Sequence, residues 1–159
     1  MTHREQIKAW LAGITLWDQT VHDWGSGSKP VSRYVQHDNV RFITLDKNPL
    51  IAEDRRSKDH ITADLTEPIH LDPADTAFCI EVLEHTLYPQ ELLENISNNL
   101  KPEGSLYLTM PYDFPVHSDD DYLRLTENGL RAHLQIAGFI IDKLEYTSDR
   151  QGYIVEAHK

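Results

Sequence analysis

The sequence predicts an α/β domain built on a mainly parallel β-sheet with helices on both faces. Short stretches rich in β-branched and aromatic residues alternate with stretches whose apolar residues recur at helical spacing, as in a parallel sheet joined by helices. Only a short turn separates the last two of these stretches, so they pair antiparallel, because a parallel crossover needs a dozen or more residues. A chain of 159 residues has room for one domain, which we place over residues 1–159.

An N-terminal helix is predicted over residues 2–16, ahead of a core at residues 18–159. Thr2 and Glu5 have the spacing of a capping box, which favours a helix that begins at this point. Apolar residues recur on one face of this helix, at Ile7, Trp10, Leu11 and Ile14.

The core is expected to contain seven strands and two further helices. Strands are predicted at residues 20–23, 40–45, 60–63, 76–80, 105–110, 139–146 and 153–158. Pro89 opens one helix, whose apolar face includes Leu100, and Thr126 caps the other, which Gly138 ends. Residues 111–125 form a polar loop that is longer than a simple connection requires.

Charge and hydropathy exclude several classes of partner. The chain has 15 Lys and Arg against 26 Asp and Glu, a formal net charge of −11, which repels nucleic-acid phosphates unless a basic stripe is present. The densest basic cluster, Arg55, Arg56 and Lys58, is surrounded by acidic residues, so we expect no nucleic-acid partner. No stretch approaches the roughly 20 apolar residues that span a bilayer, so we expect a cytoplasmic protein with no membrane partner.

The single cysteine, Cys79, excludes an internal disulfide and a cysteine-based zinc site. It lies in the apolar run Ala77-Phe78-Cys79-Ile80, where a buried and unreactive thiol is expected. We assign no metal ligands from the sequence.

Polar residues stand where the first four core strands end. These residues are Asp23 with the glycine loop that follows it, Asp46, Asp64 and Glu81. Ligands of open parallel sheets bind at the carboxyl ends of the strands, so we expect these side chains to surround one ligand site. Plain turns and helix caps are the alternative for each residue taken singly.

Their chemistry and order favour a cofactor that contains a nucleoside. Gly25 and Gly27 allow a sharp turn that exposes backbone amides to a ligand. Asp46, which follows Gly27 by 19 residues, can accept hydrogen bonds from both hydroxyls of an adenosine ribose. Asp64 can accept one from an exocyclic amine.

These segments resemble the motifs of class I S-adenosylmethionine-dependent methyltransferases. Residues 21–30, Val-His-Asp-Trp-Gly-Ser-Gly-Ser-Lys-Pro, are similar to the first motif, and Phe78-Cys79-Ile80-Glu81-Val82-Leu83-Glu84-His85 to the fourth. Leu45-Asp46 and Ala63-Asp64-Leu65 resemble the two acidic motifs between them. The resemblance, which extends over residues 18–146, implies a Rossmann-like sheet of order 3-2-1-4-5-7-6 with strand 7 antiparallel.

The resemblance also implies roles for individual residues. Asp23 and the backbone of Gly25, Ser26 and Gly27 would hold the methionine end of S-adenosylmethionine, and Glu81 would lie beside it. Asp46 would bind the ribose, and Asp64 with Leu65 the adenine; Lys47, next to Asp46, is a further cofactor-binding candidate. His85 and His117 are the candidate catalytic residues, because imidazole titrates near neutral pH.

The family likeness points to a small molecule as methyl acceptor, because residues 121–126 resemble a segment common in its small-molecule branch. Two alternatives stay open. One is a methyltransferase-like partner protein without catalysis, since His22 and Lys29 depart from the family pattern. The other is a nicotinamide-dinucleotide protein, although Pro30 stands where that fingerprint requires glycine or alanine. The oligomeric state is not predicted.

Overall fold

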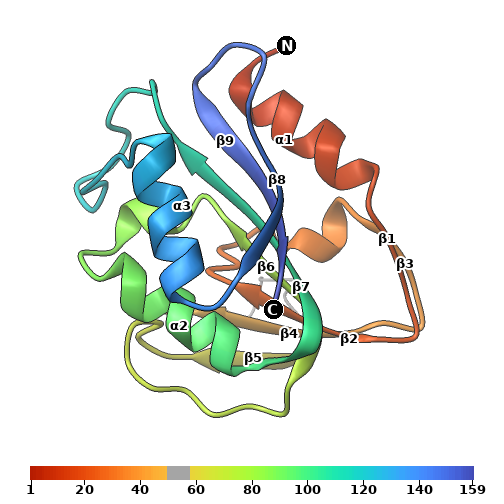
Figure 1. Ribbon diagram of the computed structural model, residues 1–159. Coiled ribbons are helices and arrows are strands. Elements are labelled where there is room, and N and C mark those ends of the chain that lie inside the picture. Colours follow the sequence, from red (N-terminus) through yellow and green to blue (C-terminus); the bar gives the residue numbers. More distant parts are fainter. Residues whose placement is uncertain (50–57) are drawn as a thin grey trace.

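A seven-stranded sheet forms the centre of the computed structural model, which describes residues 1–49 and 58–159 (Figure 1). Its strands are β2 Thr20–Trp24, β4 Arg41–Asp46, β5 Asp59–Thr62, β6 Ala74–Ile80, β7 Leu100–Pro111, β8 Ile140–Tyr146 and β9 Gly152–His158. Their order is β5-β4-β2-β6-β7-β9-β8, and β9 alone runs antiparallel to its neighbours. The predicted α/β class, strand order and reversed strand are confirmed. Arg55 and Arg56 lie outside the described residues.

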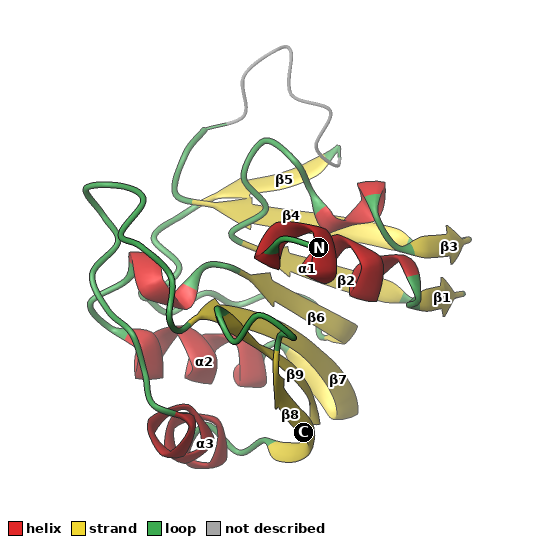
Figure 2. Ribbon diagram, turned by 90° about the horizontal axis from the view of Figure 1, so that it is seen from above, coloured by secondary structure: helices red, strands yellow, loops and turns green. Residues whose placement is uncertain are grey.

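Helices cover both faces of this sheet (Figure 2). The α-helices are α1 His3–Ala12, α2 Pro89–Asn98 and α3 Glu127–Ile136, and single 3₁₀ turns occur at η1 Val31–Arg33 and η2 Leu83–His85. Ile7 and Leu11 of α1 pack with Phe78 against one face, while α2 and α3 bury their leucines against the other. None of the helices in the described part of the chain is long and apolar enough to cross a membrane.

The N-terminal helix begins as predicted and ends early. The Thr2 hydroxyl accepts a hydrogen bond from the Glu5 amide, and Glu5 Oε2 accepts one from the Thr2 amide, which completes the capping box. The helix ends at Ala12, and residues Thr15–Trp17 form β1, a short strand paired parallel with β3, Gln36–Asp38. The predicted end at residue 16 was wrong because Gly13 interrupts the helix and the β-prone residues after it pair with β3.

A second boundary differs at Leu100, which was predicted on a helix face. The helix ends at Asn98, and Leu100 begins β7, because the Ala74 amide donates to the Asn99 carbonyl and draws the chain into the sheet. The predicted caps of α3 are confirmed, since Thr126 accepts a hydrogen bond from the Gly129 amide and Gly138 has a φ of +92°.

Candidate active site

A cavity of about 540 Å³ opens beside the carboxyl ends of β2, β4, β5 and β6. Small-molecule sites commonly have volumes of about 300–1,000 Å³, so the cavity is large enough for a cofactor. Seven of the predicted site residues line it, namely Gly25, Asp46, Lys47, Asp64, Leu65, Glu81 and His85. The apolar residues Val82, Leu87 and Tyr88, which also line the cavity, were not predicted from the sequence.

The glycine loop after β2 lies tightly against its neighbours. Gly25 has a φ of +73°, and a Cβ atom there would stand 2.5 Å from Cγ2 of Val82. The amides of Gly25 and Ser26 donate to the Leu45 carbonyl, at 2.7 and 3.1 Å, and the Gly27 amide donates to Asp46, so the loop is tied to β4. The expected exposure of these amides to a ligand was wrong, because β4 already accepts their hydrogen bonds. Gly27 has a φ of +53° but open space around its α-carbon. Only the first glycine is therefore required by packing as well as by backbone conformation.

Two carboxylates on the cavity wall are held by backbone amides. Asp46, the last residue of β4, accepts hydrogen bonds from the amides of Gly27 at 2.8 Å and Asn48 at 2.9 Å. Asp64 accepts from the Thr66 amide at 3.0 Å and from its hydroxyl at 2.7 Å, and these bonds lower the pKa of Asp64. Both acids are thus fixed in direction beside the cavity.

Asp23 is not among the residues that line the cavity. It is buried within β2, where its Oδ2 accepts a hydrogen bond from the Val31 amide at 2.7 Å. Burial raises the pKa of Asp23 to about 7, and the nearby Asp46 adds to the shift. In this structure the side chain fixes the end of the glycine loop. Ser26 is also buried, and its hydroxyl makes no hydrogen bond to any described residue.

Glu81 follows β6 and has a left-handed φ of +56°, an uncommon conformation that costs a non-glycine residue about 1–2 kcal/mol. Its Oε2 lies 3.2 Å from Nε2 of His3, a buried residue of α1. Its Oε1 is buried and makes no hydrogen bond within the described residues. His3 was missed by the sequence analysis, because its position in the amphipathic helix gives no sign of a contact 78 residues away.

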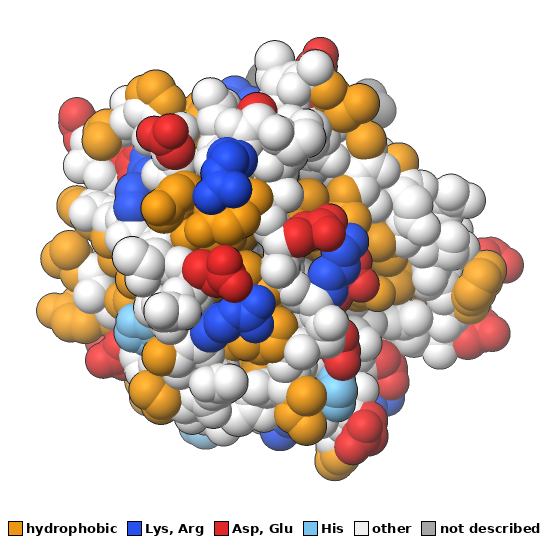
Figure 3. Space-filling view, turned by 45° about the horizontal axis from the view of Figure 1, so that its top comes forward, with side chains coloured by type: hydrophobic (Ala, Val, Ile, Leu, Met, Phe, Trp, Pro, Cys, Tyr) orange, Lys and Arg blue, Asp and Glu red, His pale blue; other side chains and the backbone are white. Residues whose placement is uncertain are grey.

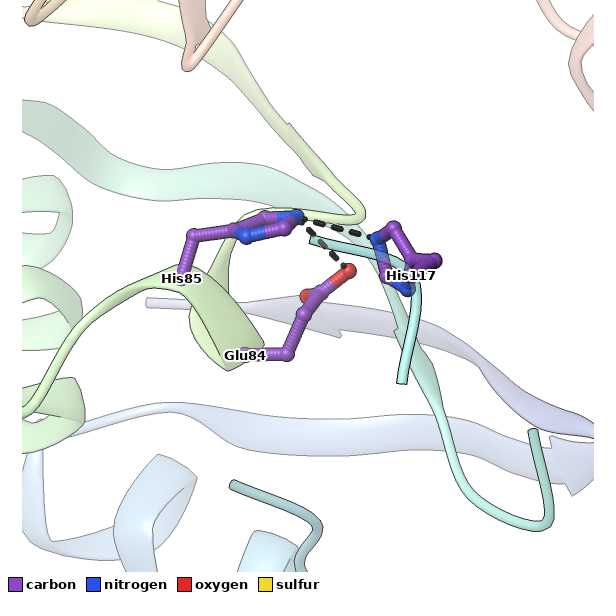
Figure 4. A group of neighbouring side chains, drawn as sticks. All are labelled: Glu84, His85 and His117. Carbon is purple, nitrogen blue, oxygen red and sulfur yellow. Dashed lines mark hydrogen bonds and ion pairs between the residues drawn. The ribbon is translucent and has the colours of Figure 1, made fainter. Parts of the chain in front are cut away.

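Beside Glu81, three side chains meet at the edge of the cavity: Glu84, His85 and His117 (Figure 4). Nε2 of His117 lies 3.3 Å from Nε2 of His85, which in turn lies 3.5 Å from Oε1 of Glu84. The two predicted catalytic histidines are therefore brought together, although only His85 lines the cavity. Glu84 was quoted in the fourth motif but not predicted as a site residue.

Glu84 is fully buried, and neither of its carboxylate oxygens makes a hydrogen bond within the described residues. Burial raises its pKa to about 9, with a further contribution from the charge of Glu81. An acid of this kind is normally neutral unless a cation is nearby. Perturbed acids of this kind are frequent at functional sites.

Both histidines are supported from the loop at residues 111–125. Nδ1 of His85 lies 3.1 Å from Asp120 Oδ1, and Nδ1 of His117 lies 2.9 Å from Asp121 Oδ2. Lys47 pairs with Asp120, and its hydrogen bond lowers the pKa of that acid; Arg124 pairs with Asp121 and lowers its pKa to about 2. The loop thus contributes ionised carboxylates that orient the two rings.

Sequence comparison connects this geometry with a known family. A family model described as a methyltransferase domain matches residues 6–141 of the chain. The chain belongs to this family. The cofactor of this family is S-adenosylmethionine. The enzyme class and the cofactor predicted from the motifs are therefore confirmed. The comparison with curated proteins finds no match to this sequence.

Solved structures share the fold at low sequence identity. A Burkholderia thailandensis 1,6-didemethyltoxoflavin N1-methyltransferase, solved with its substrate and S-adenosylhomocysteine, superposes with a TM-score of 0.73 at 18% identity, covering 98% of this chain and 77% of that one. A Haloferax volcanii protein in complex with the Trm112 methyltransferase activator has a TM-score of 0.79 at 19% identity, covering 98% and 89%. The cyclase SpnF superposes with a TM-score of 0.79 at 17% sequence identity, covering 98% of this chain and 80% of that one.

Proposed function

We propose that this methyltransferase binds S-adenosylmethionine in the cavity and transfers its methyl group to a small molecule. The observation that carries the proposal is the convergence of Asp46, Asp64 and Glu81 on one cavity beside the glycine loop. We refer to the glycine loop at residues 25–27, of which Gly25 lines the cavity, together with Asp46 and Asp64 as the cofactor side. The acceptor side comprises Glu84, His85, His117, Asp120 and Asp121.

The cofactor side has groups that suit each part of the cofactor. Asp46 has a fixed carboxylate for the ribose hydroxyls, and Asp64 and Leu65 stand where an adenine ring would be recognised. Gly25 lines the cavity and has no side chain to fill it. Glu81 lines the cavity, and its Oε1 has no hydrogen-bond partner in the described chain, which suits the polar methionine end.

The cofactor supplies a methyl group on a positively charged sulfur, which an acceptor displaces in line. The protein's contribution is mainly to position the acceptor and exclude water. His85 and His117, oriented by Asp120 and Asp121, are the groups that would handle an acceptor proton. Lys47 contributes indirectly, because it joins the cofactor side to Asp120.

A small acceptor fits the surface better than a nucleic acid does. Three exposed apolar or aromatic side chains, Leu87, Tyr88 and Tyr122, line the open part of the cavity and offer flat contacts to a small molecule. On the face shown in Figure 3, acidic and basic side chains are interspersed. Such a mixture lacks the basic field that attracts phosphates.

Equilibrium titration with S-adenosylhomocysteine tests this proposal. We expect the wild type to bind it in preference to NAD, and Asp46→Ala to weaken binding by about 1–3 kcal/mol, the range for a lost hydrogen bond to a charged group. Asp142→Ala is the matched control, because Asp142 is an exposed acid on β8 that pairs with His158. Unchanged affinity in Asp46→Ala would refute the ribose assignment, and failure of the wild type to bind would favour the non-catalytic alternative.

A further inference from the structure

The cluster of Glu84, His85 and His117 has the composition of a divalent metal site. Two imidazoles and one carboxylate bind zinc in several catalytic sites and iron in others, leaving positions open for a substrate. One candidate ligand atom from each side chain lies within 4.8 Å of the other two (Figure 4). The residues come from η2 and from the loop at residues 111–125, so the fold alone brings them together.

The distances agree with those of a tetrahedral ion. Zinc–nitrogen bonds of about 2.0–2.1 Å at a tetrahedral angle place two ligand nitrogens about 3.3 Å apart. Nε2 of His85 and Nε2 of His117 are 3.3 Å apart, and Nε2 of His85 and Oε1 of Glu84 are 3.5 Å apart. Two sides of the ligand triangle therefore have the expected length already.

The other ring nitrogens are arranged as in metal-binding histidines. Such histidines almost always donate their second N–H to a carboxylate, carbonyl or water. Here Nδ1 of His85 faces Asp120 and Nδ1 of His117 faces Asp121. With both protons held on Nδ1, both Nε2 atoms direct lone pairs toward each other, an arrangement that a shared cation stabilises and that is otherwise repulsive.

Glu84 provides a second, independent observation. A fully buried carboxyl group without hydrogen bonds destabilises the folded protein unless something pairs with it. Both oxygens of Glu84 are in this state within the described residues, and one of them lies beside the two imidazoles. A metal ion at this point would satisfy the acid and both rings at once.

We propose that Glu84, His85 and His117 bind a divalent transition-metal ion of the zinc type at the edge of the cavity. Because His85 lines the cavity, the open coordination positions would face the acceptor. If the proposed methyl transfer is correct, the two histidines of the metal-bound site would act as ligands and would not take the acceptor proton themselves. An acceptor hydroxyl bound at the ion would instead release its proton to water more readily, since a bound cation lowers the pKa of such groups. Metal binding itself does not depend on that function.

Cobalt binding to the full-length protein, free of affinity tags and stripped with a chelator, tests this inference. We expect added Co²⁺ to give a visible absorption band that saturates at one equivalent and is displaced by Zn²⁺. His117→Ala and the isosteric Glu84→Gln should weaken Co²⁺ binding by more than the roughly 10–100-fold that loss of a ligand-orienting residue costs. His158→Ala should bind as the wild type does, because His158 pairs with Asp142 without a second histidine.

Two results would overturn the metal site. One is a wild-type spectrum that excess Co²⁺ leaves unchanged; the other is equal Co²⁺ affinity in His117→Ala, Glu84→Gln and the wild type. Thermal unfolding shows that each variant is folded, and titration of the same samples with S-adenosylhomocysteine separates the two proposals. If the wild type binds S-adenosylhomocysteine but not Co²⁺, only the metal site is refuted. If it binds Co²⁺ but not S-adenosylhomocysteine, only the proposed function is refuted.

Discussion

The cofactor side and the acceptor side hold their carboxylates by different means. On the cofactor side, Asp46 and Asp64 accept hydrogen bonds from backbone amides a few residues away or on the adjoining loop. On the acceptor side, Asp121 is paired with the Arg124 side chain and Asp120 with Lys47, which lies 73 residues earlier. Backbone amides come with the fold, whereas side-chain cations must be supplied by particular residues. The cofactor side is thus a property of the strand ends, and the acceptor side a property of loop packing.

Two buried aspartates show what this difference does to acidity. Asp23, beneath the cofactor side, has one backbone hydrogen bond and a pKa raised to about 7 by burial. Asp121, on the acceptor side, has the Arg124 guanidinium and a pKa lowered to about 2. Burial alone raises the pKa of an acid and favours its neutral form. A neighbouring cation lowers the pKa by more than burial raises it.

The largest expected effect belongs to Asp23. The unfolded chain releases this proton near pH 4 and the folded chain near pH 7, so the folded state binds more protons between them. Its contribution to stability therefore falls as pH rises from about 4 to about 7, by up to about 4 kcal/mol at 1.36 kcal/mol per pKa unit. Asp23→Asn should remove this loss, so its free energy of unfolding relative to the wild type should increase over that range.

The difference between variant and wild type is the quantity to measure, by chemical denaturation at several pH values. The neighbouring His22 titrates in the opposite sense, because burial lowers its pKa to about 4 and its contribution to stability is lost as pH falls from about 6.5 toward 4. The two effects oppose each other in the wild type, so its own stability curve does not isolate Asp23. A difference that is constant with pH would show that Asp23 is not held neutral.

The second effect compares the two glycines of the cofactor side. Gly25→Ala must overcome both a positive φ and a 2.5 Å approach to Val82, so we expect it to cost about 3 kcal/mol, from roughly 1–2 for the backbone and 1–3 for overpacking. Gly27→Ala meets only the backbone cost of about 1–2 kcal/mol, which makes it the matched control. Thermal and denaturant unfolding measure both, and equal losses would mean that Val82 moves aside freely.

Most of the fold and the cofactor side followed from the sequence because their signals are local. Short stretches rich in apolar and β-branched residues predicted the seven strands, and the polar residues at the ends of the first four predicted the site. Asp46, Asp64 and Glu81 line the cavity as a result of strand order alone. The strands β1 and β3 escaped prediction because each has only three residues, too few for a period to be visible.

The acceptor side was predicted only in part because its contacts are long-range. His85 and His117 were chosen singly for their chemistry, and nothing in their spacing of 32 residues indicates that their rings meet. Glu84 has no apolar neighbour pattern that marks it as buried, since a single 3₁₀ turn directs it inward. His3 reaches Glu81 from a helix at the other end of the chain.

The smallest expected effect tests whether the acceptor side can be destabilised without changing affinity for the cofactor. Arg124→Ala removes the guanidinium that bonds to Asp121 and to the Phe114 carbonyl, and we expect a loss of about 2 kcal/mol in unfolding free energy, as for hydrogen bonds to charged groups. Because Arg124 does not line the cavity, affinity for S-adenosylhomocysteine should stay within about twofold, a difference of roughly 0.4 kcal/mol. Arg124→Ala combined with Asp121→Asn should recover part of the loss, since the Asp121 carboxylate is then no longer buried without its guanidinium partner. A large fall in the affinity of Arg124→Ala for S-adenosylhomocysteine would show that the structures of the two sides depend on each other, through the contact between Lys47 and Asp120.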